Sequence, residues 1–290
     1  MRVLIIGAGS IGTRRARILA GMGHEVHGYD PAWSTKGAKG GSITDWCVAT
    51  GAVSGASFLS GDTAYDAALI CTPPDSGRPE QIQRCLSMGV RGLFVEKPLA
   101  LDVSDVDEVL SMGLVSHDRI GPLMATVTMG ACNLRFVGGV SGLRKIKKPW
   151  RLAAFRMGQH RKHWSAAHRP ISMILDSIHE LDLAVHLNGP IESIRGYSET
   201  DVAEVSVHHE GGGLSHLHLD RVTDPPVRSV TITRKGDRDF LRLMTNDGMY
   251  EREMAHFIGC VEAGMQTCNP LRQAAEVCAR ALEVASWSAS

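Results

Sequence analysis

A glycine-rich turn between a strand and a helix constrains this chain more than any other feature. The β-branched run at residues 2–6 leads directly into Gly7-Ala8-Gly9-Ser10-Ile11-Gly12, and apolar side chains recur at helical intervals over residues 10–22. In a G-x-G-x-x-G turn the first glycine permits a tight bend, the second lets the backbone approach a pyrophosphate, and the third lets the helix pack closely on the strand. The helix N-terminus then offers its N–H groups to the phosphates. The motif predicts a dinucleotide-binding unit.

Asp30, which follows the second expected strand (residues 24–29), agrees with this prediction. A carboxylate at Asp30 can accept hydrogen bonds from the adenosine ribose hydroxyls, and its charge would repel a 2′-phosphate. No Arg or Lys follows immediately, because residues 31–33 are Pro, Ala and Trp. We therefore expect NAD(H) to be favoured over NADP(H). The alternative interpretation is a structural glycine-rich turn beside an exposed aspartate.

Strands and helices alternate through the first part of the chain. Further strands are expected at residues 67–71 and 92–95, and further helices at 78–88 and 104–112. This β-α-β-α order is typical of a parallel sheet with helices on both faces. The sequence predicts an α/β fold, a doubly wound Rossmann domain, over residues 1–122.

After residue 122 the pattern changes to runs of strands with segregated helices. Strands are expected at 125–130, 151–157, 191–197, 202–208, 214–219 and 229–233, and helices at 174–187, 251–264 and 270–286. Such an order favours an α+β domain built on a largely antiparallel open sheet. Residues 123–290 are thus expected to form a compact second domain for substrate binding and oligomerisation.

Composition excludes several classes of protein. The 290 residues carry 31 basic and 31 acidic side chains, a balance that argues against a polyanion-binding protein. The apolar run Val3–Ile6 is far shorter than the roughly 20 residues of a membrane span and lacks the features of a secretory signal. The seven cysteines form no C-x-x-C pair, as expected of thiols in a reducing cytosol. We expect a cytoplasmic protein with a small-molecule substrate and no nucleic-acid or membrane partner.

Five segments in the same order resemble motifs of the Gfo/Idh/MocA family of NAD(P)-dependent oxidoreductases, which includes glucose-fructose oxidoreductase and inositol dehydrogenase. Glu96-Lys97-Pro98 resembles the family's EKP signature. The others are Cys71-Thr72-Pro73-Pro74, similar to the loop beneath the nicotinamide; Asn133-Leu134-Arg135-Phe136, similar to the beginning of the second domain; residues 174–182, similar to the catalytic helix; and residues 253–264, similar to the closing segment.

The resemblance implies hydride transfer between nicotinamide and a carbinol or carbonyl carbon of a sugar, nucleotide sugar or polyol. Lys97 would orient the substrate hydroxyl and His179 would act as general acid/base, because an imidazole near its neutral pKa can shuttle the hydroxyl proton. Asp176 lies three residues before His179, so on one helix both side chains share a face. Glu96 would position the strand end or Lys97, and the peptide before Pro98 is expected to be cis.

The resemblance also implies cofactor contacts and a shared interface. The expected cofactor contacts are Gly7, Gly9, Ser10, Ile11, Gly12, Asp30, Cys71, Thr72, Pro73, Glu96 and Lys97.

A basic cluster at 160–164 and 168–169 could bind a carboxylate or a nucleotide-sugar phosphate, or could be an exposed loop. The expected substrate residues are Arg135, His160 and His163. No metal is expected, because no ligand set has recognisable spacing. The family's pairing of open sheets implies a homodimer or homotetramer.

Two departures from the family pattern keep other functions open. Leu175 stands four residues before His179, where many members have an aspartate, and residues 170–173 replace the usual glycine triplet. The loop closing the substrate pocket is therefore expected to be shortened or re-routed. A reductase of a non-sugar carbonyl or imine and a catalytically silent dinucleotide-binding sensor or partner protein are the alternatives. For Lys97 and His179 the alternative roles are a solvated surface pair with Glu96 and a core histidine.

Overall fold

The computed structural model describes residues 1–30, 64–75, 77–112, 126–145, 152–160, 171–233 and 237–287. The chain divides into two compact units, one of Met1–Ala131 with Tyr250–Ala275 and the other of Cys132–Met249 with Glu276–Ser290. The first unit thus includes residues 126–131 and 250–275, which the sequence analysis assigned to the second domain. The domain division at residue 122 itself stays a prediction.

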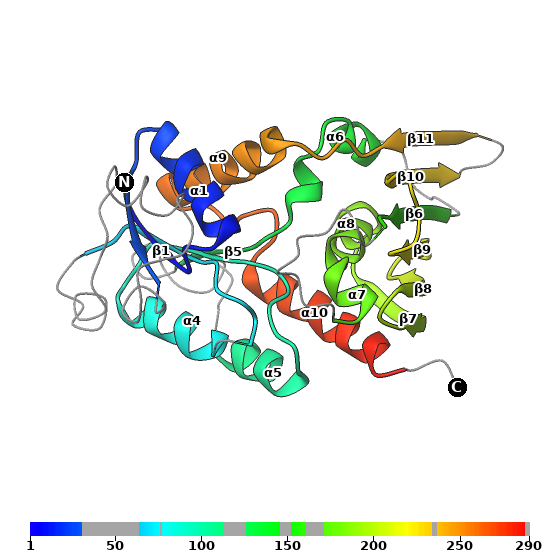
Figure 1. Ribbon diagram of the computed structural model, residues 1–290, viewed down its shortest axis with the longest axis horizontal. Coiled ribbons are helices and arrows are strands. Elements are labelled where there is room, and N and C mark those ends of the chain that lie inside the picture. Colours follow the sequence, from blue (N-terminus) through cyan, green and yellow to red (C-terminus); the bar gives the residue numbers. More distant parts are fainter. Residues whose placement is uncertain are drawn as a thin grey trace. The chain divides into compact units, whose positions relative to one another are not determined.

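The first unit contains a five-stranded parallel sheet (Figure 1). Its strands, in the order β2-β1-β3-β4-β5, are β1 (Arg2–Ile6), β2 (Glu25–Tyr29), β3 (Ala67–Ile70), β4 (Gly92–Val95) and β5 (Val127–Gly130). The helices are α1 (Ser10–Gly21), α4 (Arg78–Ser87), α5 (Val103–Ser111), most of α9 (Asp247–Ala263) and the start of α10 (Leu271–Ala285). Because β1 lies between β2 and β3, the strand order reverses there, and open α/β sheets bind ligands beyond the carboxyl ends of the strands at such a point.

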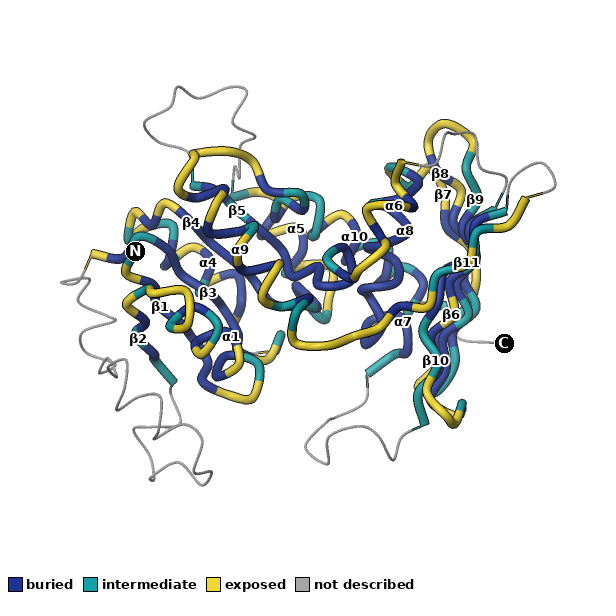
Figure 2. Tube along the Cα trace, turned by 90° about the horizontal axis from the view of Figure 1, so that it is seen from above, coloured by how far each residue is buried: buried dark blue, intermediate teal, exposed yellow. Residues whose placement is uncertain are grey.

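The core of this unit follows from apolar strands that are covered on both faces. All residues of β3 and β4 are buried, and both strands are dark blue in Figure 2. Helix α9 packs against β4, where the rings of Phe94 and Phe257 meet edge to face at 5.6 Å between centroids. A Cβ on Gly92 would lie only 2.4 Å from the Val261 side chain, so a glycine is needed for this close approach.

The second unit contains a six-stranded mixed sheet in the order β11-β10-β6-β9-β8-β7. Its strands are β6 (Leu152–Gly158), β7 (Ile191–Ser198), β8 (Val202–His209), β9 (Leu214–Asp220), β10 (Val227–Thr233) and β11 (Arg238–Arg242). Its short helices are the 3-10 helix η3 (Asn133–Phe136), α6 (Val140–Arg144), α7 (Met173–Asp176) and α8 (Ile178–Asn188). Every neighbouring pair of strands is antiparallel except β6 with β9, and α8 packs against β6, β9 and η3. The predicted fold class is confirmed.

Sequence patterns missed two elements of this unit and predicted one helix where there are two. Strand β11 was missed because its exposed positions are charged or aromatic, which is common on an edge strand, and the sheet is therefore wider than the compact one expected. Helix α6, with glycine before and within it, was also missed. The helix expected at 174–187 is two helices, α7 and α8, separated at Ser177.

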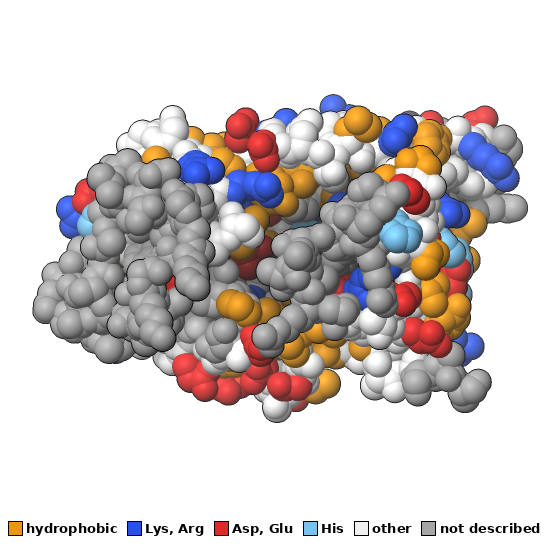
Figure 3. All heavy atoms as spheres, in the orientation of Figure 1, with side chains coloured by type: hydrophobic (Ala, Val, Ile, Leu, Met, Phe, Trp, Pro, Cys, Tyr) orange, Lys and Arg blue, Asp and Glu red, His pale blue; other side chains and the backbone are white. Residues whose placement is uncertain are grey.

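The described surface carries an acidic patch on the first unit. Asp102, which caps α5, is exposed, as are Asp107 and Glu108 within the helix. Figure 3 shows acidic side chains, in red, along the lower edge of the view, where α5 lies in Figure 1. Like charges gathered on one face repel a polyanion locally. Among the residues described, no helix is long and apolar enough to span a membrane.

Candidate active site

The three glycines of the turn after β1 differ in what their surroundings allow. Gly7 has φ +92°, and a Cβ there would lie 2.6 Å from the backbone nitrogen of Thr72. A Cβ on Gly12 would lie 1.9 Å from the carbonyl oxygen of Gly7. By contrast, a Cβ on Gly9 would meet nothing within 4 Å. The fold itself therefore requires Gly7 and Gly12, while Gly9 leaves open space beside the backbone.

The N-terminus of α1 is suited to an anion. Its N-cap is Gly9, which offers no side-chain oxygen to the first turn, and that turn contains no acidic residue. Backbone N–H groups at such a helix end favour phosphate through hydrogen bonds and the helix dipole. Together with the open space beside Gly9, this end of α1 fits the pyrophosphate of a dinucleotide.

Asp30 lies against the same turn. Its Oδ2 accepts a hydrogen bond from the Ala8 N–H at 2.8 Å, and the Gly7 N–H donates to the Tyr29 carbonyl at 2.8 Å. The carboxylate expected to bind a ribose is thus held at the carboxyl end of β2, directly beside the glycine turn.

The ends of β3 and β4 bring the next expected residues to this edge of the sheet. The Cys71 N–H donates to the Ile6 carbonyl at 2.7 Å, and the Glu96 N–H donates to the Ile70 carbonyl at 2.9 Å. The segments beginning at Cys71 and Glu96 therefore follow neighbouring strands. Lys97 is half-buried there, and its peptide bond with Pro98 is cis, as the resemblance implied.

Arg78, which the sequence analysis missed, joins these two segments. It lies at the beginning of α4, is fully buried, and donates hydrogen bonds to the carbonyls of Thr72, Glu96 and Pro98, the last at 2.8 Å. Its guanidinium therefore fixes the backbone on both sides of Lys97. The one signal in the sequence was an arginine at the beginning of the helix that follows the Thr-Pro-Pro loop.

Arg15, also missed, holds the Glu96 side chain. It is fully buried on α1, pairs with Glu96, contacts Glu253 of α9 at 2.9 Å, and lies 4.2 Å from the centroid of the Phe94 ring. Burial opposes its charge, but Glu96 and Glu253 outweigh that penalty and raise the pKa of Arg15. Glu96 is therefore positioned by an ion pair. The signal was the position of Arg15, four residues from both Ile11 and Leu19 on the apolar face of the helix.

The surroundings of Cys71 favour its neutral thiol. Burial raises the pKa of its thiol to about 12, and the nearby Glu96 carboxylate acts in the same direction. The thiolate is the reactive form of cysteine, and it is disfavoured here. Cys71 therefore contributes packing beneath the glycine turn, where Gly7 comes close to its backbone.

In the second unit, His179 lies in the first turn of α8 and is 8% exposed. Asp176 ends α7, where its carboxylate pairs with the buried Arg221 and also accepts a hydrogen bond from the Ile171 N–H at 3.4 Å. The expectation that Asp176 and His179 share one continuous helix was wrong, because Ser177 interrupts it with φ −105° and ψ 28°. Arg221 neutralises the charge of Asp176 at this break.

The three expected substrate residues differ in their surroundings. Arg135 forms a bidentate ion pair with Asp182 of α8, at 2.8 Å and 2.6 Å, and both side chains are buried. Its guanidinium thus holds η3 to α8. His160 follows β6, and its N–H donates to the Thr223 carbonyl at 2.8 Å. His163 lies outside the described residues.

No metal centre was found in the parts of the chain that the structure describes, where no three His, Cys, Asp or Glu side chains are arranged to hold an ion. The buried His209 contacts the Gly189 carbonyl at 2.7 Å and the Ser215 hydroxyl at 2.8 Å. Both ring nitrogens of His209 thus make contacts within the second unit.

Comparisons with known proteins agree with this geometry. Residues 1–117 match the family model GFO_IDH_MocA, described as an oxidoreductase family with an NAD-binding Rossmann fold. A search of curated protein sequences gave no match.

Solved structures share the fold over nearly the whole chain. UDP-N-acetylglucosamine 3-dehydrogenase GnnA from Acidithiobacillus ferrooxidans is 19% identical with a TM-score of 0.77, over 99% of this chain and 97% of that one. A putative myo-inositol dehydrogenase from Sinorhizobium meliloti is 19% identical with a TM-score of 0.78, over 99% and 96%. An Agrobacterium radiobacter oxidoreductase, solved with NAD⁺, L-tartaric acid and magnesium, is 14% identical with a TM-score of 0.77, over 99% and 95%. At these identities the likeness shows the fold alone.

Proposed function

We propose that this chain is an NAD(H)-dependent oxidoreductase of the Gfo/Idh/MocA family, because its residues 1–117 match that family's model. It transfers a hydride between the nicotinamide and a carbinol or carbonyl carbon of a sugar, nucleotide sugar or polyol. One observation carries the proposal: the glycine turn, Asp30 and the segment containing Lys97 meet at the carboxyl ends of neighbouring strands. This substrate class is our proposal by analogy with two proteins of the same fold, UDP-N-acetylglucosamine 3-dehydrogenase and a putative myo-inositol dehydrogenase.

The cofactor-binding residues follow from the glycine turn. The first-turn N–H groups of α1 bind the pyrophosphate beside Gly9, and the Asp30 carboxylate accepts hydrogen bonds from the ribose hydroxyls. The negative charge of Asp30 would repel a 2′-phosphate, which favours NAD(H). When bound, the dinucleotide supplies the group that accepts or donates the hydride.

Lys97 orients and polarises the substrate oxygen. A protonated amine stabilises the charge that develops on an alkoxide, provided that it is held in place before the reaction. Arg78 and the ion pair between Arg15 and Glu96 supply that rigidity, because they fix the backbone next to Lys97 from two helices.

His179 carries the hydroxyl proton. An imidazole with a pKa near neutrality is suited to accept this proton in one direction and return it in the other. Since the Asp176 carboxylate pairs with Arg221, we assign Asp176 a positioning role at the junction of α7 and α8.

The cofactor assignment is tested by calorimetric titration of the cofactor-stripped protein with NADH and with NADPH. We expect tighter binding of NADH. Tighter binding of NADPH would refute the role of Asp30 and direct attention to the basic residues Arg14, Arg15 and Lys36. Arg14 is exposed, Arg15 is buried between two carboxylates, and Lys36 lies outside the described residues. If neither dinucleotide binds, the proposed function is wrong.

The role of Lys97 is tested by Lys97→Ala. We expect turnover to fall by about 10²-fold or more, the usual contribution of a positioned proton-transfer or polarising group, with NADH affinity nearly unchanged. Lys145→Ala, at an exposed lysine after α6, is the matched control and should retain activity. Full activity of Lys97→Ala would exclude the mechanism.

A further inference from the structure

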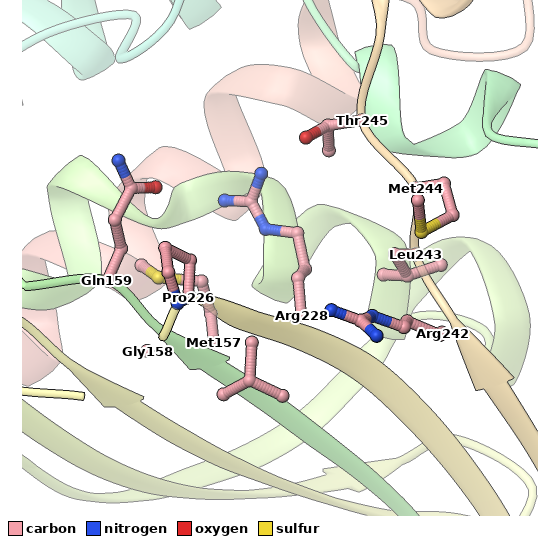
Figure 4. Close-up of a pocket in the computed structure, with 10 residues that line it drawn as sticks. Met157, Gly158, Gln159, Pro226, Arg228, Arg242, Leu243, Met244 and Thr245 are labelled. Atoms are coloured by element: carbon pink, nitrogen blue, oxygen red, sulfur yellow. The ribbon is translucent and has the colours of Figure 1, made fainter. Parts of the chain in front are cut away.

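The second unit contains a pocket that no proposed role above uses. Its volume is about 190 Å³, and it lies where β6 and β11 end and β10 begins (Figure 4). Its polar lining residues include Gln159, Arg228, Arg242 and Thr245. Pockets that bind a whole small molecule usually have volumes of roughly 300–1,000 Å³, so this smaller pocket has the size of a subsite for part of a ligand.

The lining carries positive charge. It includes two guanidinium groups, the amide of Gln159 and the hydroxyl of Thr245, and it includes no carboxylate. The side chains of Arg228 and Arg242 are drawn in Figure 4 on two neighbouring strands, β10 and β11. Guanidinium groups match the planar geometry of carboxylate and phosphate oxygens, which they bind through paired hydrogen bonds.

Only one of the two arginines is neutralised. Arg228 contacts the Glu180 carboxylate at 2.6 Å, and Glu180 is 1% exposed, so this pair balances one charge inside the unit. Arg242 is exposed and forms no ion pair with any residue that the structure describes. A structural ion pair accounts for Arg228, whereas Arg242 leaves one net positive charge at the pocket.

The pocket is linked to the helix of the proposed acid/base. Glu180 directly follows His179 in the first turn of α8, and its contact with Arg228 joins that turn to β10. A group bound at Arg228 and Arg242 would therefore have a fixed position relative to His179 within the same unit.

We propose that this pocket binds an oxyanion group of the substrate, a phosphate or a carboxylate, with Arg242 as its principal ligand and Arg228 as the second. The inference rests on the proposed function and narrows it, because it selects acidic or phosphorylated sugars over neutral polyols. The chemistry shared by the two sources is a group with at least two charged oxygens.

The test is calorimetric titration with three probes: uridine diphosphate, glucuronate and glucose, at constant ionic strength. The titrations are made with saturating NADH as well as without it, because the glycine turn also favours phosphates. We expect at least one of the two anions to bind more tightly than glucose. Tighter binding of uridine diphosphate assigns the pocket to phosphate, and tighter binding of glucuronate assigns it to a carboxylate.

The variant Arg242→Gln identifies the site of binding. We expect this substitution to weaken binding of the preferred anion by about tenfold or more, the usual effect of losing a charge-assisted contact, without changing NADH affinity. Arg238→Gln is the matched control, since Arg238 is also exposed on β11 but does not line the pocket, and it should bind like the wild type. Arg228→Gln is not used, because it would leave the buried Glu180 carboxylate without its partner.

The proposal is overturned if neither anion binds better than glucose, or if Arg242→Gln binds the anion as well as Arg238→Gln does. These results are separate from those for the proposed function. If the protein oxidises a neutral polyol with NAD⁺ but binds neither anion, only the proposal for the pocket is refuted. A protein that binds the anion through Arg242 but transfers no hydride would refute the oxidoreductase and keep the pocket. With an acidic substrate, Arg242→Gln should raise KM while kcat changes little.

Discussion

At the scale of single residues, buried arginines determine the geometry of the candidate active site. Arg15 and Arg78 are both fully buried, yet one holds carboxylates and the other holds carbonyl oxygens. A buried ion pair contributes little net stability compared with apolar packing, but removing one partner leaves an uncompensated charge. These contacts therefore fix the position of Glu96 and Lys97 more than they stabilise the fold.

Arg15→Met tests this at the most deeply buried pair. The substitution keeps an unbranched side chain but leaves Glu96 and Glu253 facing each other without a cation, so we expect a loss of about 3–5 kcal/mol in the free energy of unfolding. Denaturant unfolding measures it. Arg14→Met, at the exposed neighbour that lies 4.8 Å from the Tyr250 ring centroid, should cost no more than about 1 kcal/mol. Equal losses in the two variants would contradict the prediction.

His186 makes stability depend on pH. Burial lowers its pKa from 6.5 to about 3, and the positive charges of Arg135 and Arg144 act in the same direction. Below pH 6.5 the His186 imidazole binds a proton in the unfolded chain but not in the folded protein. This contribution to stability is therefore complete above pH 6.5 and is lost as the pH falls towards 3.

The expected loss between pH 7 and pH 5 is about 1 kcal/mol, since the partial exposure of His186 reduces the roughly 2 kcal/mol of full linkage. Denaturant unfolding of the wild type and of His186→Gln at both pH values measures it. The variant should lose less stability over this interval, by about that amount. His208→Gln, at an exposed position on β8, should behave like the wild type. Parallel pH profiles for all three proteins would disprove the assignment.

At the scale of elements, the turn between β1 and α1 separates folding requirements from binding requirements. Gly9 has φ −65° and ψ −169°, which any residue can adopt, and a Cβ there meets nothing within 4 Å. Gly12 has no such space, because a Cβ would collide with the Gly7 carbonyl. A glycine at position 9 thus leaves space for a ligand, whereas a glycine at position 12 allows α1 to pack on β1.

The pair Gly9→Ala and Gly12→Ala tests this difference. Gly9→Ala should change stability by no more than about 0.5 kcal/mol but weaken NADH binding by about tenfold or more, because its methyl group occupies the approach to the pyrophosphate. Gly12→Ala should lower both stability and NADH affinity. Thermal unfolding and calorimetry measure the two effects. Unchanged NADH affinity in Gly9→Ala would show that the turn serves the fold alone.

The junction of α7 and α8 shows where local periodicity fails. The apolar spacing over 174–187 predicts one helix, yet the Asp176 carboxylate is held by Arg221, which follows β9. The Ile174 N–H donates to the Ser198 hydroxyl at 3.0 Å. Contacts with distant strands therefore determine where this helix is interrupted, and no spacing within the segment records them.

At the scale of the whole molecule, the first unit is built from two separate chain segments. Residues 250–275 contribute Glu253 as a partner of Arg15 and Phe257 against Phe94. A fragment of residues 1–131 lacks these groups, so its β4 would expose apolar surface and its buried arginine would lose a carboxylate.

We therefore expect fragment 1–131 to unfold without a cooperative transition and to bind no NADH. The same fragment joined to residues 250–275 by a flexible glycine-serine linker should regain both properties. Circular dichroism during thermal unfolding and NADH titration measure the difference. Cooperative unfolding of the shorter fragment would show that the first unit does not need its second segment.

Local sequence patterns were enough to predict the fold class, the glycine turn with Asp30 beside it, and the segment Glu96-Lys97-Pro98 at a strand end. These features depend on neighbours along the chain: strand and helix periodicity, a required positive φ, and a short path from strand to turn. The folded chain was needed to show which carboxylates hold Arg15, that Arg135 is paired with Asp182, and that Arg228 and Arg242 line one pocket. A buried charge pairs with the groups that lie beside it in the folded protein, and these depend on the order of strands in the sheet. Local sequence spacing does not predict that order.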